Sequence, residues 1–547
     1  MAVIKQNDAH FYSSLGKLHD TTAYLYGPNT HQVVLQSEDR NIVRMASTSL
    51  ELLDQLQPKD DVVKLLLNML KNHIQLHKDG GLFTTLLTTK LITKRYSEEV
   101  PVCAMVACKK VLLDKMKEIL LRVSCDVNVG RLSEIFCVLK AVVCSKMLLT
   151  HDELTHLSLL FAKTFGSVFP HSDTSSVTVV TDCSNNITSS SLHNGCLLPL
   201  GLRTSQEISN ILLKLRNHNV LLIGTSLSLA ADELIAEAGS RVTVESVEHL
   251  KNEVVLDEVL EFCERLVNYG SVVVCQKVVH PLIKSFFRKH NVLCVERVGS
   301  MNIPKLEKVL GCKQISSLHV DNISDNVGKF DEFLCLDIGE KSYLSISSHE
   351  STFKTIILCH RNERLGDILK HCYESSMKVL QSLLMSPGVV PGGGCVETKL
   401  CMKLVACVSQ LSTPLGCSEG QLRKVVKIVV DSLLDISLNV ESYSSYFRHS
   451  IDSSFHHHWI NASTSVSCCC GLVKKRSDRE IDFVSFEEIM SRDLSGCAVD
   501  KNGPTPELPE PPVSYLCHPL NIYLSNLTTA FQAADVVSRI GFRVGDS

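Results

Sequence analysis

The sequence predicts a helical domain with an α/β domain inserted into it, and two observations support this fold class. The first is the order of patterns: residues 45–165, 365–411 and 419–440 read as amphipathic helices, whereas residues 195–345 alternate strand-length apolar runs with helical segments. The second is the length of 547 residues, which is too great for one core because cores stop growing at about 250–300 residues. We expect two or three domains.

Apolar residues recur at a helical spacing in the first helical region. Apolar residues from Val62 to Ile74 recur three and four positions apart, which predicts one amphipathic helix, and Ser133–Leu149 and Glu153–Phe165 repeat the pattern. A Ser/Thr/Asn-rich stretch, Asp173–His193, then interrupts the helices and contains β-branched runs such as Ser176–Thr181. This stretch is typical of a linker to an inserted domain.

The inserted region alternates strands and helices. Strand-length apolar runs occupy 219–223, 271–275 and 292–295, and helical patterns lie at 203–216, 253–268 and 280–289. This alternation predicts a sheet with crossover helices. Beyond residue 440, a polar, loop-rich stretch covers 441–512, and a last helix is expected over Ser525–Ile540.

The composition is that of a globular protein, with 44% hydrophobic and 21% charged residues. The net charge of −4 and the lack of a basic stripe argue against nucleic acid or a membrane surface as partners. No apolar run approaches the ~18 residues of a membrane span, and the N-terminus lacks the apolar core of a signal peptide. We therefore expect a soluble, cytosolic protein whose 23 cysteines are reduced.

An Asp-Gly-Gly turn, Asp79–Gly81, lies between two long helical patterns. The N–H groups and the dipole at the start of the second helix favour a phosphate, and the carboxylate of Asp79 could hold Mg²⁺ against it. The plainer interpretation is that glycine ends one helix and aspartate caps the next. From these residues alone, the plainer interpretation is the stronger one.

Three glycines, Gly392, Gly393 and Gly394, precede another helical pattern and allow the backbone to approach a ligand closely. A flexible turn between helices explains them equally well. No G-x-x-x-x-G-K-S/T pattern occurs, which excludes a Walker-type phosphate loop.

The clusters His456–His458 and Cys468–Cys470 suggest a zinc site. Structural zinc sites, however, space their ligands in pairs, and adjacent side chains cannot all converge on one ion. We interpret the two clusters as a polar loop followed by a buried strand.

In order and separation, these pieces resemble a group II chaperonin subunit over almost the whole chain. The segments that carry the resemblance are Leu25–Thr30, Ser37–Arg40, Lys78–Leu82, Val273–His280, Val292–Val298, Thr355–Leu358, Leu365–Val379, Val389–Glu397, Pro519 and Ala530–Ile540. The resemblance implies a three-domain group II chaperonin architecture, with a helical equatorial domain, a small intermediate domain and an α/β apical domain. The expected segments are 1–145 and 380–547 (equatorial), 146–194 and 346–379 (intermediate), and 195–345 (apical).

The resemblance also implies a site for ATP and Mg²⁺. The residues expected to contact the nucleotide are Gly27, Pro28, Asp79, Gly80, Gly392, Gly393 and Gly394. Asp79 would hold the Mg²⁺. The family's catalytic aspartate falls on Glu374, which is one methylene longer, and a misplacement of about 1 Å can slow catalysis about a hundredfold.

Other family residues at this site are absent. The two threonines expected after Asp79 and Gly80 are replaced, and the Lys-Gly expected after Pro28 is Asn29-Thr30. We therefore expect ATP hydrolysis to be weak or lost, while nucleotide binding through the three glycines could survive. Two alternatives stay open: an active ATP-hydrolysing chaperonin subunit in protein folding, and a nucleotide-independent scaffold.

Within the family, the motifs most resemble a divergent chaperonin-like branch. This implies a role in assembling a ciliary coat complex, the BBSome. The expected partners are related chaperonin-like subunits, the conventional cytosolic chaperonin and subunits of that coat complex, and the expected location is the cytoplasm with the centrosome or ciliary basal body. Residues 441–512 and Gly541–Ser547 depart most from the family, so a stable homo-oligomeric ring is not expected.

Overall fold

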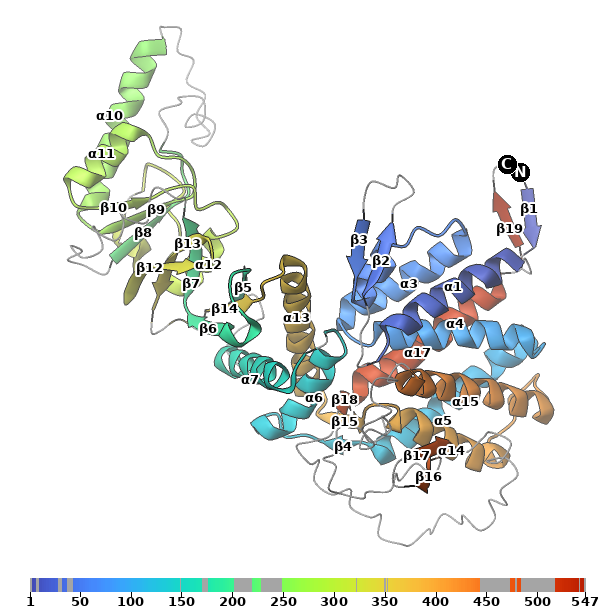
Figure 1. Cartoon of the computed structure of the whole chain (residues 1–547). Coiled ribbons are helices and arrows are strands. Elements are labelled where there is room, and N and C mark those ends of the chain that lie inside the picture. Colours follow the sequence, from blue (N-terminus) through green and yellow to red (C-terminus); the bar gives the residue numbers. More distant parts are fainter. Residues whose placement is uncertain are drawn as a thin grey trace. The chain divides into compact units, whose positions relative to one another are not determined.

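The computed structural model in Figure 1 divides into two compact units. The first combines residues 1–162 with 371–547, and the second comprises residues 163–370. The structure describes residues 2–5, 9–27, 32–36, 43–147, 149–169, 176–200, 219–227, 248–320, 322–348, 351, 353–442, 473–477, 480–483, 517–540 and 542–545. The helix predicted over 203–216 and most of 441–512 lie outside these residues.

Helices from both ends of the chain build the first unit. They are α1 (Ala9–Leu25), α2 (Ser49–Gln55), α3 (Asp61–His77), α4 (Gly81–Ser97), α5 (Val102–Val123), α6 (Leu132–Cys144), α14 (Cys395–Cys407), α15 (Glu419–Ser442) and α17 (Leu520–Arg539). Two more, α7 (His151–Val168) and α13 (Glu363–Met385), belong in part to each unit. One core contains Phe11 and Leu70 together with Leu433 and Phe531, so the two helical ends are packed together.

Helix α4 lies within this core and carries the turn that opens the site. It packs against α1, α15 and α17, and its Leu86, Leu87 and Leu91 are fully buried. Thr84 and Thr88 are buried as well, but their hydroxyls donate to backbone carbonyls one turn earlier, which satisfies them inside the core. The packing on several sides fixes the position of the first turn of α4.

Short strands bring distant segments beside the glycine run. Strand β15 (Gly388–Pro391) pairs antiparallel with β18 (Cys517–Pro519) and with β4 (Cys125–Asp126). It interrupts the helix predicted over 365–411, because Pro387 and the following glycines disfavour a helix interior. The other strand pairs are β1 (Ala2–Lys5) with β19 (Phe542–Gly545), β2 (Val33–Gln36) with β3 (Val43–Ala46), and β16 (Val473–Ser477) with β17 (Glu480–Phe483).

The second unit confirms the predicted alternation of strands and helices. Strands β8 (Asn219–Ile223), β9 (Val272–Cys275) and β10 (Leu293–Val295) run parallel, and β11 (Val327–Lys329) pairs antiparallel with β8. Alternate residues of β8 and β9 enter different clusters, one with α12 (Ile303–Leu310) and the other with α10 (Glu248–Val267) and α11 (Pro281–Lys289). Helices therefore bury both faces, which explains the continuous apolar runs.

Two smaller sheets complete the second unit. One has the order β12 (Glu332–Ile338), β13 (Lys341–Ser347) and β7 (Cys196–Leu200), and the other β5 (Val177–Asp182), β14 (Lys354–Cys359) and β6 (Ser191–Asn194). Strand β5 includes most of the β-branched run Ser176–Thr181, and β14 includes the segment Thr355–Leu358. In the described part of the chain, no helix is long and apolar enough to cross a membrane.

Candidate functional site

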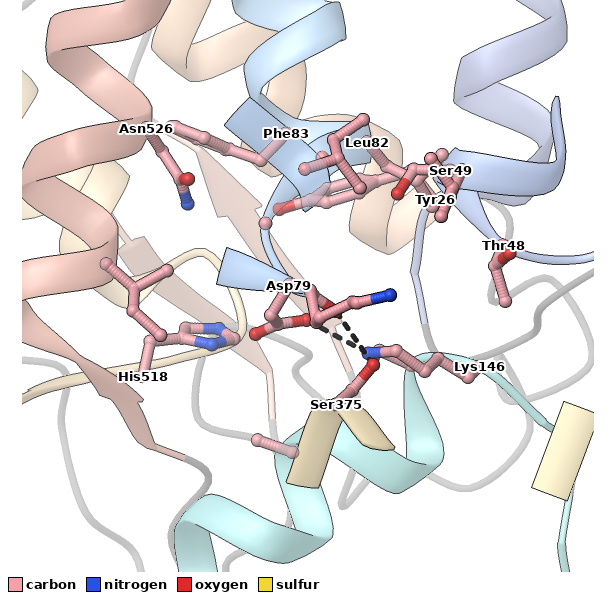
Figure 2. A pocket seen from close by; sticks show the side chains of 18 of the residues that line it. Tyr26, Thr48, Ser49, Asp79, Leu82, Phe83, Lys146, Ser375, His518 and Asn526 are labelled. Carbon is pink, nitrogen blue, oxygen red and sulfur yellow. Dashed lines mark hydrogen bonds and ion pairs between the residues drawn. The ribbon is translucent and has the colours of Figure 1, made fainter. Parts of the chain in front are cut away.

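A cavity in the first unit gathers many of the residues that the sequence singles out. Its volume is about 160 Å³, far more than the ~10–15 Å³ that one water molecule needs. Figure 2 shows side chains from several elements pointing toward one another there. The lining residues are Tyr26, Gly27, Ser47–Leu50, Ile74, Lys78–Phe83, Ala141, Cys144–Lys146, His371, Glu374, Ser375, Gly393, Glu397, His518, Pro519, Ile522, Tyr523 and Asn526.

The turn between α3 and α4 requires glycine at two positions. Gly80 is the N-cap of α4 and has a φ of 73°, in the left-handed region. A Cβ atom on Gly80 would lie 2.0 Å from Asn526 Nδ2, and one on Gly81 would lie 2.4 Å from Ser49 Oγ. The turn is a helix boundary, but the plainer interpretation is wrong about its caps: Lys78, with a φ of 57°, ends α3, and Gly80 rather than Asp79 is the N-cap of α4. The residues of the turn also line the cavity.

Asp79, in the same turn, forms an ion pair with Lys146, whose Nζ lies 2.9 Å from Oδ1 of the carboxylate (Figure 2). Both side chains are largely buried, with 15% of Asp79 and 11% of Lys146 exposed. Burial alone would raise the pKa of Asp79, but the Lys146 ammonium, with help from His518 and the Gly80 N–H, holds that pKa below its ordinary value. The carboxylate is therefore ionised at neutral pH.

The sequence did not single out Lys146. It stands two residues beyond the end of α6, and its Nζ also donates to Val142 O at 3.3 Å. In the sequence, Lys146 is a lysine near the end of the helical pattern Ser133–Leu149, and a lysine in the last turn of a helix is ordinary. Lys146 and Asp79 are far apart in the sequence, and only the fold brings them together.

Glu374 lines the cavity from α13. Its Oε2 lies 3.9 Å from Lys78 Nζ and 4.0 Å from His371 Nδ1, and its side chain is 37% exposed. The neighbouring Ser375 donates a hydrogen bond of 2.7 Å to the carbonyl of Lys78 and so ties α13 to the turn. The structure thus places Glu374 at the cavity, beside two basic side chains that hold it only loosely.

Only one of the three glycines Gly392–Gly394 lines the cavity. Gly393 lines it, whereas Gly392 and Gly394 are not among the lining residues. Gly394 is the N-cap of α14 with a φ of 89°, and a Cβ atom there would lie 2.5 Å from Ser437 Oγ. Close packing against α15 therefore requires a glycine at this position.

The first expected phosphate loop is described only in part. Gly27 lines the cavity and has a φ of 116°. Pro28 and the next two residues lie outside the described part of the chain, as does Asp39. The structure therefore places Gly27 at the cavity. The expected contact of Pro28 with the nucleotide stays a prediction.

A buried hydrogen bond joins two residues of the cavity wall. The Tyr523 hydroxyl donates to Glu397 Oε1 at 3.0 Å. Burial and the nearby Glu397 raise the pKa of Tyr523 and of Tyr26 well above their ordinary value. Both phenols therefore stay protonated, and the Tyr523 proton is donated to Glu397.

Among the residues that the structure describes, no group of three or more His, Cys, Asp or Glu side chains is placed to hold a metal ion. The clusters His456–His458 and Cys468–Cys470 lie outside those residues, so their interpretation stays a prediction. The cavity combines three carboxylates, those of Asp79, Glu374 and Glu397, with the two lysines Lys78 and Lys146 and with the start of α4, where Gly80 is the N-cap. Within this lining, the helix start and the two lysines are the groups that can bind a phosphate.

Comparison with known proteins identifies the class. Residues 18–437, well over half of the chain, match the TCP-1/cpn60 chaperonin family. The chain therefore belongs to this family, and its mixture of helices and sheets is a group II chaperonin-like fold. The five-segment division into equatorial, intermediate and apical parts stays a prediction.

The relatives within the family point to a divergent member. The molecular chaperone MKKS of Mus musculus is 27% identical over 498 residues, which cover 85% of each chain. MKKS of Pongo abelii is 26% identical over 384 residues, 69% of this chain and 67% of its own. Thermosome subunit alpha of Saccharolobus shibatae is 29% identical over only 174 residues, 31% of this chain and 30% of its own. These matches confirm the resemblance to a divergent chaperonin-like protein, the one named for McKusick–Kaufman and Bardet–Biedl syndromes.

Proposed function

We propose that this chaperonin-like protein is an assembly factor that binds nucleotide in the cavity and hydrolyses it weakly or not at all. The observation that carries the proposal is the composition of the cavity. Asp79, Lys78 and Lys146 converge on the start of α4, whereas Gly81 and Leu82 stand where the family resemblance leads us to expect two threonines. Lysine ammonium groups for binding are present, and the two threonine hydroxyls that the resemblance leads us to expect after Gly80 are missing.

Phosphate binding has three supports. The start of α4 presents backbone N–H groups and the positive end of the helix dipole. Lys78 and Lys146 add two ammonium groups, which bind phosphate as point charges. Thr48 and Ser49, at the start of α2, add hydroxyls to the cavity wall. A nucleotide would place its phosphates against these groups.

Water activation is the weak step of the proposed site. A general base must lie within hydrogen-bond reach of the water that it activates, and its carboxylate must be oriented. Glu374 approaches Lys78 and His371 at 3.9 and 4.0 Å, distances too long to orient it firmly. A threonine hydroxyl that donates to a phosphate oxygen supplies roughly 1.5–3 kcal/mol, and neither Gly81 nor Leu82 has a hydroxyl to donate.

Purified protein is expected to release phosphate from ATP at the background rate, and Glu374→Gln is expected to leave that rate unchanged. Glu363→Gln is the matched control, because Glu363 is exposed at the start of the same helix. A steady-state phosphate-release assay measures all three proteins. Turnover that Glu374→Gln abolishes and Glu363→Gln preserves would instead establish an active ATP-hydrolysing chaperonin subunit.

The partners that we propose are related chaperonin-like subunits, the conventional cytosolic chaperonin and BBSome subunits, met in the cytoplasm at the centrosome or basal body. The family resemblance and the extended match to MKKS proteins support this. Affinity capture of the tagged chain from ciliated cells, read by mass spectrometry, tests it. Enrichment of coat-complex and chaperonin subunits supports the proposal, and their absence from a capture that retains the intact chain refutes it.

The isolated protein is expected to be a monomer, and to join larger particles only with related subunits. The segments that depart most from the family, 441–512 and Gly541–Ser547, fall where ring subunits add strands to a neighbour's sheet. Native mass spectrometry at micromolar concentration measures the assembly state. A closed ring of identical subunits would show that this expectation is wrong.

A further inference from the structure

We infer that Cys108 and Cys417 form a site of reversible oxidation, at which hydrogen peroxide converts the two thiols into a disulfide bond. The two sulfur atoms lie 3.5 Å apart, although 309 positions separate the residues in the sequence. Neither residue lines the cavity, so the inference does not depend on the proposed function. The fold has brought together two thiols that no local sequence pattern connects.

The two thiols differ in their access to solvent. Cys108 lies on α5, is fully buried and belongs to the core of the first unit. Cys417 is partly exposed and packs against the edge of that core. It stands directly before Ser418, whose hydroxyl accepts a hydrogen bond from the Gln421 N–H at the start of α15. A small oxidant in solution therefore meets Cys417 first.

The backbone around Cys417 can make the remaining approach. A disulfide bond joins its sulfur atoms at about 2.05 Å, so the two atoms must move together by about 1.5 Å. The Cys417 N–H donates to Pro414 O at 3.2 Å, which closes a turn over Leu415 and Gly416. Both residues inside the turn are exposed. The turn can therefore shift toward α5 without displacing core side chains.

The oxidation proceeds in two balanced steps. The Cys417 sulfur attacks one oxygen of hydrogen peroxide, the O–O bond breaks, and the products are a sulfenic acid and water. The Cys108 sulfur then attacks the Cys417 sulfur, the S–O bond breaks, and the hydroxyl leaves as a second water with the Cys108 proton. Burial and the neighbouring Cys417 thiol raise the pKa of Cys108 above its ordinary value, so Cys108 stays a thiol until the sulfenic acid forms beside it.

The disulfide bond joins two parts of the first unit that the chain connects only through the second. Cys108 belongs to residues 1–162 and Cys417 to residues 371–547, and the second unit, 163–370, lies between them in the sequence. The bond therefore closes a loop that contains the whole second unit. Cross-links that close long loops restrict the unfolded chain most, so oxidation is expected to stabilise the first unit until a reductant reverses it.

Peptide mapping of the full chain after treatment with hydrogen peroxide tests the inference. The remaining thiols are alkylated, the protein is digested with trypsin without reduction, and linked peptides are identified by mass spectrometry. The expected product joins peptides 96–109 and 404–423, and it disappears when the chain is reduced before digestion. Recovery of Cys108 as an alkylated thiol and of Cys417 as an alkylated thiol or a sulfinic acid would overturn the inference.

Variants assign the bond, because the two peptides also contain Cys103 and Cys407. Cys417→Ser is expected to abolish the linked product. Cys103→Ser is the matched control and should preserve it, because Cys103 is exposed on the same helix. A linked product that survives Cys417→Ser would show that the bond lies elsewhere. Should this variant fail to fold, fragmentation of the wild-type linked peptides decides which two cysteines are joined.

The same oxidation is expected to raise the midpoint of thermal unfolding by about 5 °C. Dithiothreitol should reverse the shift, Cys417→Ser should prevent it, and Cys103→Ser should leave it intact. Differential scanning fluorimetry of the full chain, with and without peroxide, measures the midpoint. An unchanged midpoint in protein that carries the linked product would overturn the stabilising effect of the bond.

Discussion

Replacing Gly80 with alanine is expected to lower the free energy of unfolding by about 2–5 kcal/mol. Two costs add. An L-residue at a φ of 73° is strained by roughly 1–2 kcal/mol, and the new Cβ atom would lie 2.0 Å from Asn526 Nδ2. Asn526 cannot turn aside freely, because its Oδ1 is hydrogen-bonded to His73 Nε2 at 2.7 Å. Denaturant unfolding followed by circular dichroism measures the change.

The matched control for this substitution is Gly16→Ala. Gly16 lies inside α1, and nothing is within 4 Å of the position that its Cβ would occupy. Alanine there is expected to stabilise the fold by about 0.5–1 kcal/mol, since glycine weakens a helix interior. In the double variant Gly80→Ala/Asn526→Ala, part of the stability should be recovered. A neutral effect of Gly80→Ala would contradict the close approach of α17 to the turn.

Asp79→Asn is expected to destabilise the protein by about 3 kcal/mol at neutral pH, because it leaves the buried Lys146 ammonium without its carboxylate. The effect also depends on pH. The pKa of Asp79 is lower in the folded protein, so the pair stabilises the fold above the unfolded value of 3.8 and is lost as pH falls through the lower folded value. Unfolding titrations of both proteins from pH 7 into acid should therefore converge.

A double-mutant cycle isolates the pair. Asp79→Asn, Lys146→Met and the double variant are compared, and the double variant should be less damaged than the sum of the two single changes. The control is Lys64→Met, which breaks the exposed pair with Asp61, where the side chains are 54% and 81% exposed. That change should cost at most about 1 kcal/mol. Additive effects at Asp79 and Lys146 would show that the two groups do not interact.

Local sequence patterns predict the fold correctly where each pattern is compatible with only one type of secondary structure. The three-and-four spacing in Val62–Ile74 predicts α3, and strand-length runs between helical patterns predict β8, β9 and β10. Because those strands are buried on both faces, their sequences do not alternate between apolar and polar residues. They are predicted instead from the length of the apolar runs and from the residues that flank them. No local sequence pattern predicts that β15 pairs with β4 and β18, because the three strands come from distant regions of the chain.

The candidate site could be predicted where glycine and the family resemblance coincide. Gly27, Asp79, Gly80, Glu374 and Gly393 all line the cavity, as the family resemblance led us to expect. Without the resemblance, the Asp79–Gly81 turn indicates only a helix boundary, and the glycine run is explained equally well by a flexible turn. The ion pair could not be predicted in the same way. A lysine at a helix end is ordinary in sequence, and its burial against a carboxylate depends on how α6 packs in three dimensions.

We expect this chaperonin-family chain to hold nucleotide without turning it over. The most direct test is equilibrium dialysis of the purified full chain against ATP, followed by chromatography of the nucleotide that the denatured protein releases. We predict stoichiometric nucleotide, recovered as ATP. Recovery as ADP would contradict the account in favour of an active ATPase, and recovery of no nucleotide would contradict it in favour of a nucleotide-independent scaffold.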